Sequence, residues 1–250
     1  MKTCKLLKYK DRYKDQAIVI IGSGYGLNNL TPDQIKIIEN DYISIGCNQS
    51  YLKVKSNYYI SGHLHHSLMQ YHFGGDTSAV VFQGEPQNFY ESQSYNVDVL
   101  TDINIVGEDG YLPLPDNGIN IPLVGAEQIG FSATHLAYIF GAKKIIYIGF
   151  DFSAKGHFYN IDSDSMSILK SNADFIRQKY YGKNTFIDED IDDFYTFNLR
   201  QDINIVAFRN SDSIIDKFGS YIKSLIDFGV EPYTIDTCVL NNFGCKIIEL

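Results

Sequence analysis

Short apolar runs alternate with polar, turn-forming segments along much of the chain. The first run covers residues 17–21, is mostly β-branched, and stops at Gly22-Ser23-Gly24. A buried parallel strand that enters a tight turn has this pattern. Further strands are predicted at residues 42–46, 57–61, 79–82, 103–106, 144–150 and 230–235.

Helix signals separate several of these strands. Thr31 is a predicted N-cap, Pro32 takes the first helical position, and an apolar stripe follows at residues 35–38. Two further helices are predicted over residues 131–140 and 214–226, with Gly141 and Gly229 as their terminating glycines. The order strand, helix, strand predicts right-handed βαβ units. We therefore expect an α/β fold with a Rossmann-like, doubly wound and mainly parallel sheet.

The size of the chain fits one large domain. It has 250 residues, of which 44% are hydrophobic and 20% charged, and this is enough for a self-sufficient core. No internal repeat or low-complexity linker divides it, so residues 1–250 are expected to form a single Rossmann-like domain. Residues 160–205 are acidic and aromatic, with a helix indicated near 168–176, and we expect a lid or insert at about 160–205.

Charge and cysteine content exclude some partners. The net charge of −9 disfavours a phosphate-tracking surface, so no nucleic acid is expected as a partner. The four cysteines form no C-x-x-C pair, which suits a reducing compartment, and we expect a cytoplasmic protein. No run of about 18 apolar residues occurs, so no membrane span is predicted. The sequence is compatible with a homo-oligomer as well as with a monomer.

The glycine turn after the first strand is the strongest local signal for a ligand. Glycines at Gly22 and Gly24 would let backbone N–H groups approach a phosphate. The alternative is a tight strand-to-helix connection with no ligand. The turn is not a full G-x-G-x-x-G, and Asn48 stands where a dinucleotide-binding protein carries an acidic residue. A nicotinamide-dependent dehydrogenase is therefore excluded as an interpretation.

Polar residues follow several of the predicted strands. Ser23, Asn48 and Asp151 come directly after three strands, and Gly62-His63 follows another. Open parallel sheets bind ligands beyond the carboxyl ends of their strands, so these residues are expected to converge on one nucleotide-binding crevice. The alternatives are an Asx-type turn for Asn48, and an N-cap or loop bracket for Asp151.

Histidines supply the candidate acid or base. His157 lies in the loop after Asp151 and is the better candidate, because it would sit at the crevice mouth. Tyr159 is a candidate donor to a departing phosphate. The cluster at residues 63–66 has no second His or Cys cluster downstream at ligand spacing, so it is interpreted as a surface turn and no metal site is predicted.

Three segments together resemble a known family. Residues 18–24, 46–51 and 141–152 resemble Rossmann-like bacterial sialyltransferases and their relatives around archaeal 6-hydroxymethylpterin diphosphokinases. The terminal stretch from 230 to 243 fits the same pattern. The resemblance covers the sheet-forming segments, about half of the chain, and leaves about 64–125 and 160–205 unmatched.

The resemblance implies roles for individual residues. Gly22, Ser23 and Gly24 would meet the nucleotide phosphates, and Asn48 would contact the nucleotide. The segment after Gly130, which includes Ser132, would line the cytidine pocket, and Asp151 would mark its floor. In the family, a sugar passes with inversion from a cytidine monophosphate (CMP) donor to a hydroxyl without a required metal, and Tyr159 matches a tyrosine that steadies the leaving phosphate.

The family's catalytic histidine has no equivalent at the matching region. That region reads Phe208-Arg209-Asn210-Ser211-Asp212 here, and no histidine follows His157. His157 or a carboxylate such as Asp151 would then serve as the base. The glycine turn also departs from the family, because Ser23 and Tyr25-Gly26 replace a small polar residue and Pro-Ser.

The leading hypothesis is a glycosyltransferase of the sialyltransferase type. It would bind a nucleotide sugar and a glycan or small-molecule acceptor, and it would require no cofactor. The first alternative is a diphosphokinase that moves pyrophosphate to a hydroxymethyl heterocycle, with Mg²⁺ held by carboxylates such as Asp151. The second is a non-catalytic nucleotide-binding protein on the same fold.

Overall fold

The structure is a computed structural model of the chain. It describes residues 2–3, 9–61, 64–75, 79–83, 97–100, 103–105, 123–125, 129–152, 157–160, 162–180 and 212–250.

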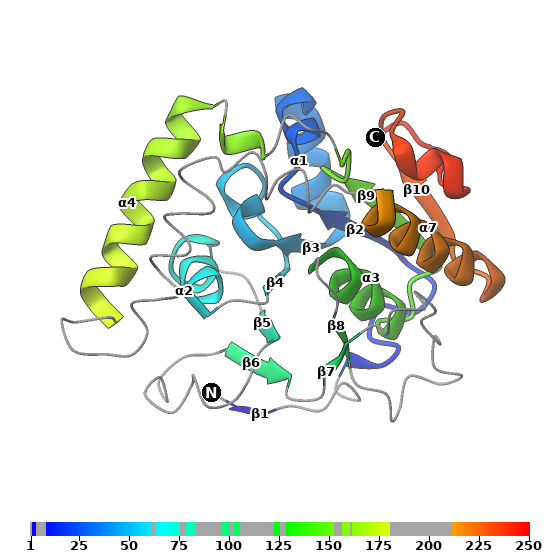
Figure 1. Ribbon diagram of the computed structural model, residues 1–250, viewed down its shortest axis with the longest axis horizontal. Coiled ribbons are helices and arrows are strands. Elements are labelled where there is room, and N and C mark those ends of the chain that lie inside the picture. Colours follow the sequence, from blue (N-terminus) through cyan, green and yellow to red (C-terminus); the bar gives the residue numbers. More distant parts are fainter. Residues whose placement is uncertain are drawn as a thin grey trace.

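One parallel sheet forms the centre of the molecule. Its strand order is β1-β6-β5-β4-β3-β2-β9-β10-β11, and every neighbouring pair is parallel. Figure 1 shows the labelled strands from β1 to β10 in this spatial order across the molecule. The strands of this sheet are β1 (Lys2–Thr3), β2 (Ala17–Ile21), β3 (Ile43–Cys47), β4 (Tyr58–Ser61), β5 (Ala79–Gln83), β6 (Val97–Leu100), β9 (Lys144–Ile148), β10 (Glu231–Thr234) and β11 (Lys246–Ile247).

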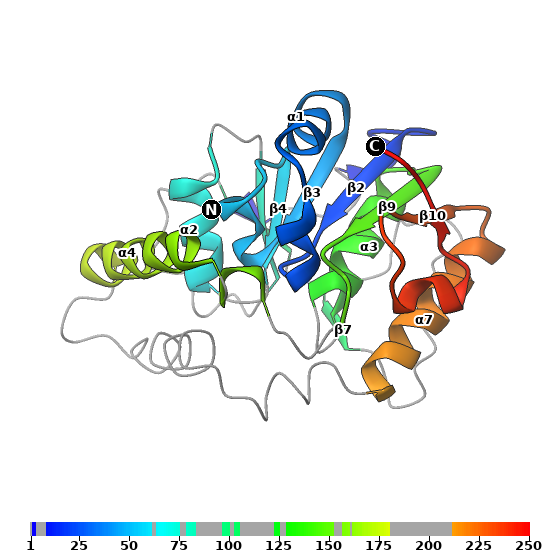
Figure 2. The same ribbon diagram turned by 90° about the horizontal axis from the view of Figure 1, so that it is seen from above.

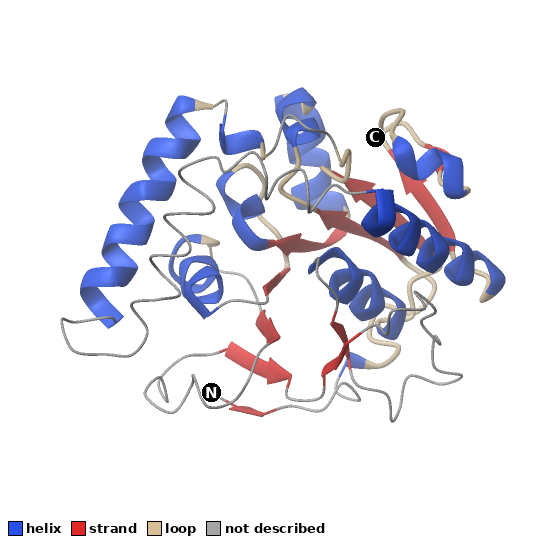
Figure 3. Cartoon of the chain, in the orientation of Figure 1, coloured by secondary structure: helices blue, strands red, loops and turns tan. Residues whose placement is uncertain are grey.

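Helices cover both faces of the sheet, as Figure 3 shows by the red strands between blue helices. One face carries α3 and α7, and the other carries α1, α2 and α4 (Figures 1 and 2). The helices are α1 (Pro32–Asp41), α2 (Leu64–Phe73), α3 (Ile129–Ile139), α4 (Ser163–Tyr180) and α7 (Asp212–Asp227), with the short 3₁₀ turns η2 (Tyr25–Asn29), η3 (Asn48–Leu52), η5 (Phe158–Asn160) and η7 (Val239–Phe243). The α/β, Rossmann-like, doubly wound architecture predicted from the sequence is confirmed.

Alternate side chains of β2 explain why its sequence is apolar throughout. Ile18 and Ile20 belong to the core cluster under α3 and α7, whereas Val19 and Ile21 belong to the cluster under α1, α2 and α4. All four are fully buried. A central parallel strand buried on both faces needs such a continuous run.

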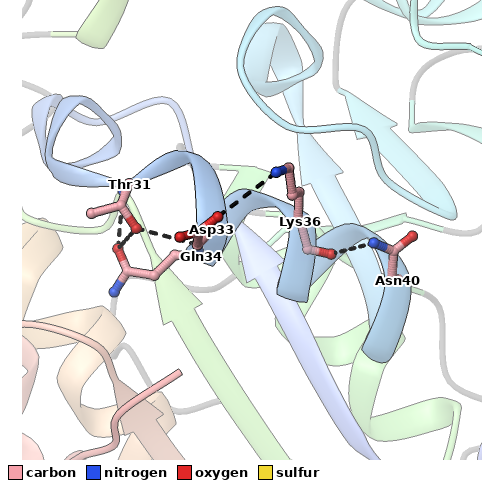
Figure 4. A network of polar contacts seen from close by, with 5 residues as sticks. All are labelled: Thr31, Asp33, Gln34, Lys36 and Asn40. Carbon is pink, nitrogen blue, oxygen red and sulfur yellow. Dashed lines mark hydrogen bonds and ion pairs between the residues drawn. The ribbon is translucent and has the colours of Figure 1, made fainter.

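The first helix begins where the sequence predicts. The Thr31 hydroxyl accepts a hydrogen bond from the backbone N–H of Gln34, and the Thr31 N–H donates to Gln34 Oε1 at 3.0 Å. Figure 4 shows this capping box, with Lys36 paired to Asp33 on the next turn. The reciprocal bonds satisfy backbone donors that the first helical turn otherwise leaves open.

The chain reverses its direction of winding between β2 and β9. From β2 the chain proceeds to β3 and β4 on one side, and β9 and β10 lie on the other side. The last residues of the two central strands, Ile21 and Ile148, are paired. A crevice outside the carboxyl ends at such a switch point is where open α/β sheets bind ligands.

The strand predicted at 103–106 is present as β7 (Ile103–Ile105), which pairs with β8 (Leu123–Gly125) in a separate two-stranded sheet. One sequence prediction about an element needs correction. Residues 64–66 were interpreted as part of a surface turn, but they begin α2, and His66 is buried. The reason is that α2 buries polar and apolar residues side by side, so its sequence shows no apolar period.

The predicted lid at about 160–205 is described only in part. Residues 163–180 form α4, whose Leu169, Ala173 and Ile176 pack in the core cluster beside α2. The rest of the predicted lid lies outside the described residues, so the lid stays a prediction. No helix in the part of the chain that the structure describes is long and apolar enough to cross a bilayer.

Candidate functional site

The glycine turn after β2 packs tightly against the end of β9. The Gly22 N–H donates to the Ile148 carbonyl at 2.8 Å, and the Gly24 N–H donates to the Gly149 carbonyl at 3.0 Å. A Cβ at either glycine would lie 2.5 Å from the Gly149 carbonyl oxygen. Close packing therefore accounts for glycine at both positions. Phosphate binding by this turn stays a prediction.

Asp151 lies against the same turn. Its Oδ1 atom accepts a hydrogen bond from the Gly26 N–H at 3.1 Å, at the start of η2. A Cβ at Gly24 would collide with this oxygen. The carboxylate thus brackets the loop and is also half-exposed at the carboxyl end of β9. The sequence predicts that Asp151 and Ser23 converge on one crevice, and the structure places Asp151 against the turn that contains Ser23.

Ser23 ties the ends of two strands together. Its side chain is 8% exposed, and its hydroxyl donates to the Cys47 carbonyl at 3.1 Å. Cys47 is the last residue of β3, and Asn48 follows it directly. The hydrogen bond therefore places Asn48 next to the glycine turn of β2.

His157 crosses the end of β2 and faces the carbonyl of Ser23. Its Nδ1 atom lies 3.2 Å from that oxygen, and the N–H of Phe158 donates to the same oxygen at 3.1 Å. Residues 24 and 157 also form an antiparallel bridge. A carbonyl oxygen only accepts, so Nδ1 carries the hydrogen and the neutral ring keeps its lone pair on Nε2. This is the tautomer of a general base that acts through Nε2.

The ring of Tyr159 stacks against the ring of His157. The two rings stack with centroids 5.0 Å apart and planes 14° apart, and Tyr159 is fully buried. Asn28 Nδ2 donates to the Phe158 carbonyl at 3.2 Å, which fastens this segment to η2. The structure places Tyr159 next to the candidate base, and its predicted contact with a leaving phosphate stays a prediction.

Two predicted residues lie on α3. Gly130 and Ser132 are both buried in this helix. A Cβ at Gly130 would lie 2.5 Å from the ring of Phe150, which stacks on Phe218 of α7 with centroids 5.7 Å apart. Gly130 therefore makes room for an aromatic residue beside Asp151. The predicted ligand residues Gly62 and His63 lie outside the described residues.

A cleft of about 230 Å³ opens at the carboxyl ends of β9 and β10. Its lining residues are Tyr25, Gly26, Asn29, Tyr147, Ile148, Gly149, Phe150, Asp151, Thr234, Ile235, Asp236, Thr237 and Cys238. The stretch from 236 to 238 was missed at the level of sequence, although it directly follows the strand predicted at 230–235. Applying the carboxyl-end rule to that strand would have found it.

Thiol chemistry does not fit the described cysteines. Burial raises the pKa of the Cys238 thiol at the cleft, and the Asp151 and Asp236 carboxylates raise it further. Burial also raises the pKa of Cys47 and brings that of Cys245 to about 12. Such thiols stay protonated near neutral pH and are poor nucleophiles. Among the described residues, no three His, Cys, Asp or Glu side chains gather in a way that could hold a metal ion.

Of three comparisons with known proteins, the one with solved structures found similar proteins. No protein-family model matches the chain, and no curated protein matches it. The sialyltransferase CstII from Campylobacter jejuni in complex with the substrate analogue CMP-3FNeuAc matches with 10% identity and a TM-score of 0.46, over 93% of this chain and 85% of that chain. A mutant of the alpha-2,3/8-sialyltransferase CstII matches with 14% identity and a TM-score of 0.48, over 93% and 86%. CstII with cytidine-5'-monophosphate matches with 19% identity and a TM-score of 0.40, over 67% and 78%.

Proposed function

We propose that this protein is a glycosyltransferase that uses a CMP-activated sugar, with His157 as the general base. The observation that carries the proposal is the hydrogen bond between His157 Nδ1 and the Ser23 carbonyl at the switch point of the sheet. It leaves the basic lone pair on Nε2, beside the carboxyl ends of β2 and β9.

The proposed reaction is a single displacement with inversion. The acceptor hydroxyl oxygen attacks the anomeric carbon, the bond from that carbon to the phosphate oxygen breaks, and CMP leaves with the electron pair. His157 Nε2 takes the hydroxyl proton. In the proposal Asp151 brackets the glycine turn through its Oδ1 atom, which accepts from the Gly26 N–H, and His157 is the base. Positioning of the two substrates supplies the remaining acceleration.

The choice of donor rests on the residues that resemble bacterial sialyltransferases, at 18–24, 46–51 and 141–152. The proposed nucleotide-binding residues are Gly22, Ser23, Gly24, Asn48, Gly130 and Ser132. The Ser23 hydroxyl donates to the carbonyl of Cys47, the residue before Asn48, so Ser23 and Asn48 lie close together. This arrangement fits a nucleotide that spans the ends of β2 and β3. The acceptor, a glycan or small molecule, is proposed to enter at the mouth of the same crevice.

The direct test is incubation of the purified protein with CMP-sialic acid and a mixture of glycan acceptors. Release of CMP and formation of a sialylated product, measured by chromatography and mass spectrometry, are expected with and without EDTA. Neither transfer nor hydrolysis of the donor would contradict the proposal. Activity on a nucleoside triphosphate that EDTA abolishes would favour the diphosphokinase, and CMP binding without turnover would favour the non-catalytic protein.

A further inference from the structure

Asn48 is held in an unusual way at the end of β3. Its backbone has φ of +48°, a left-handed conformation that asparagine adopts more readily than most residues. Gln70 Nε2 donates to the Asn48 carbonyl at 2.7 Å, and His66 Nδ1 lies 3.2 Å from Asn48 Oδ1. The main chain and the side chain of Asn48 are thus each fixed by one residue of α2.

Both of these residues lie on the buried face of α2. His66 and Gln70 are four positions apart, so they project from the same side of the helix. Their side chains are 4% and 0% exposed. Burying polar side chains against a sheet costs free energy that apolar residues would not cost, unless their hydrogen bonds are used. In this helix His66 Nδ1 contacts Asn48 Oδ1, and Gln70 Nε2 donates to the carbonyls of Asn48 and Ile60.

The two contacts fix which end of the Asn48 amide faces outward. An amide oxygen only accepts, so His66 donates from Nδ1 to Asn48 Oδ1. Because the amide is planar, Nδ2 then lies on the side away from His66. Among the residues that the structure describes, no acceptor takes a hydrogen bond from Asn48 Nδ2. Asn48 is half-buried and adjoins the Ser23 hydrogen bond to Cys47.

We propose that His66 and Gln70 are positioning residues that turn the Asn48 amide so that its Nδ2 hydrogens face the nucleotide. The site then selects a hydrogen-bond acceptor at that point, a ribose or phosphate oxygen of CMP. This inference rests on the proposed function, since it names the group that orients one of its ligand-binding residues.

The test compares His66→Asn with His66→Gln, two amides that differ in reach. Asparagine places its donor where histidine carries Nδ1, whereas glutamine places its donor near the position of Nε2. We expect the affinity for CMP, measured by calorimetry, to stay within about threefold of wild type in His66→Asn and to fall about tenfold in His66→Gln. Thermal melting verifies that both variants are folded.

A double-mutant cycle with Asn48→Ala separates positioning from general damage. In that background His66→Gln is expected to change CMP affinity by less than about twofold, because no amide is left to orient. Equal weakening in both backgrounds, or equal affinities of the two His66 variants, would overturn the inference. If His66→Gln does not fold, Gln70→Leu replaces it in the same cycle.

Failure of the proposed function gives a different result. Wild-type protein that does not bind CMP contradicts that function, and the orientation of Asn48 is then judged by nitrogen-15 NMR of the ligand-free protein. A His66 ring protonated on Nδ1, with Asn48 side-chain resonances that move in His66→Gln, supports the positioning role. A ring protonated on Nε2 overturns it.

Discussion

His157 Nδ1 lies 3.2 Å from the carbonyl oxygen of Ser23, so a residue far along the chain is fixed at the end of the first long strand. The stacked ring of Tyr159 restricts its rotation further. An imidazole whose Nδ1 donates to a carbonyl has a defined tautomer, with its lone pair on Nε2.

Replacing His157 by Gln is expected to lower transfer from CMP-sialic acid by about 10² to 10⁴ while CMP affinity stays within about threefold. Glutamine keeps a polar side chain but has no basic nitrogen. Steady-state rates and calorimetry measure the two quantities. His72→Gln, the same change on α2 away from the crevice, is the matched control and should leave the rate unchanged. Equal loss in both variants, or full activity of His157→Gln, would exclude His157 as the base.

The pair Ser23→Asp and Ser23→Asn tests whether phosphate charge lies at the glycine turn. The two side chains have nearly the same shape, but aspartate places a negative charge against the phosphate. We expect CMP affinity to fall at least about 30-fold more in Ser23→Asp than in Ser23→Asn. Calorimetry at low salt gives the comparison, with thermal melting to confirm folding. Similar CMP affinities of the two variants would contradict the placement of the phosphate at this turn.

Two glycines of the same loop are expected to differ sharply when changed to alanine. At Gly24 a Cβ would meet Asp151 Oδ1 and the Gly149 carbonyl, whereas at Gly26 its nearest neighbour is Asp151 Oδ1 at 3.4 Å, an ordinary contact. Gly24→Ala should lower the free energy of unfolding by about 2–3 kcal/mol, and Gly26→Ala by less than about 1 kcal/mol. Urea denaturation measures both, and equal effects would contradict the close approach of β9.

The fold was predictable where burial leaves a clear apolar pattern in the sequence. The strand at 17–21 is apolar throughout because both of its faces are buried, and the rule for carboxyl ends of parallel strands brought Ser23 and Asp151 to the same turn. The strand expected at 144–150 ends at Ile148, because Gly149 has φ of +72° and turns the chain.

The elements that escaped prediction lack such a pattern. Helix α2 buries His66, Ser67 and Gln70 together with Leu68 and Met69, so its buried positions mix polar and apolar residues and show no apolar period. The Ser67 hydroxyl pairs with Ser61 at 2.6 Å, a partner that no local pattern reveals. The contacts of His66 and Gln70 with Asn48 could not be predicted either, because they depend on which helix packs over which strand end.

Removing the N-cap of α1 should destabilise the protein without changing its activity. Thr31→Ala deletes the acceptor for the Gln34 N–H, and we expect a loss of about 1 kcal/mol in the free energy of unfolding. Thr31→Ser keeps the hydroxyl and should recover most of that loss. Urea denaturation of the three proteins provides the measurement, and an unchanged midpoint in Thr31→Ala would contradict the role of the cap.

The stability of the protein should depend on pH through His135. This side chain is fully buried in α3, and burial lowers its pKa from 6.5 to about 4. Between these values the unfolded chain binds a proton that the folded chain does not, so the free energy of unfolding falls as pH decreases. The contribution is fully present above about pH 6.5, is lost progressively toward pH 4, and is on the order of 3 kcal/mol.

Two variants without a titratable group test this dependence. His135→Leu and His135→Gln remove the proton-binding site, so their free energies of unfolding should decrease less steeply between pH 6.5 and 4 than that of wild type. Each variant is compared with its own value at pH 7.5, which cancels any loss from altered packing. Curves that run parallel to wild type across this range would show that His135 does not stay neutral in the folded protein.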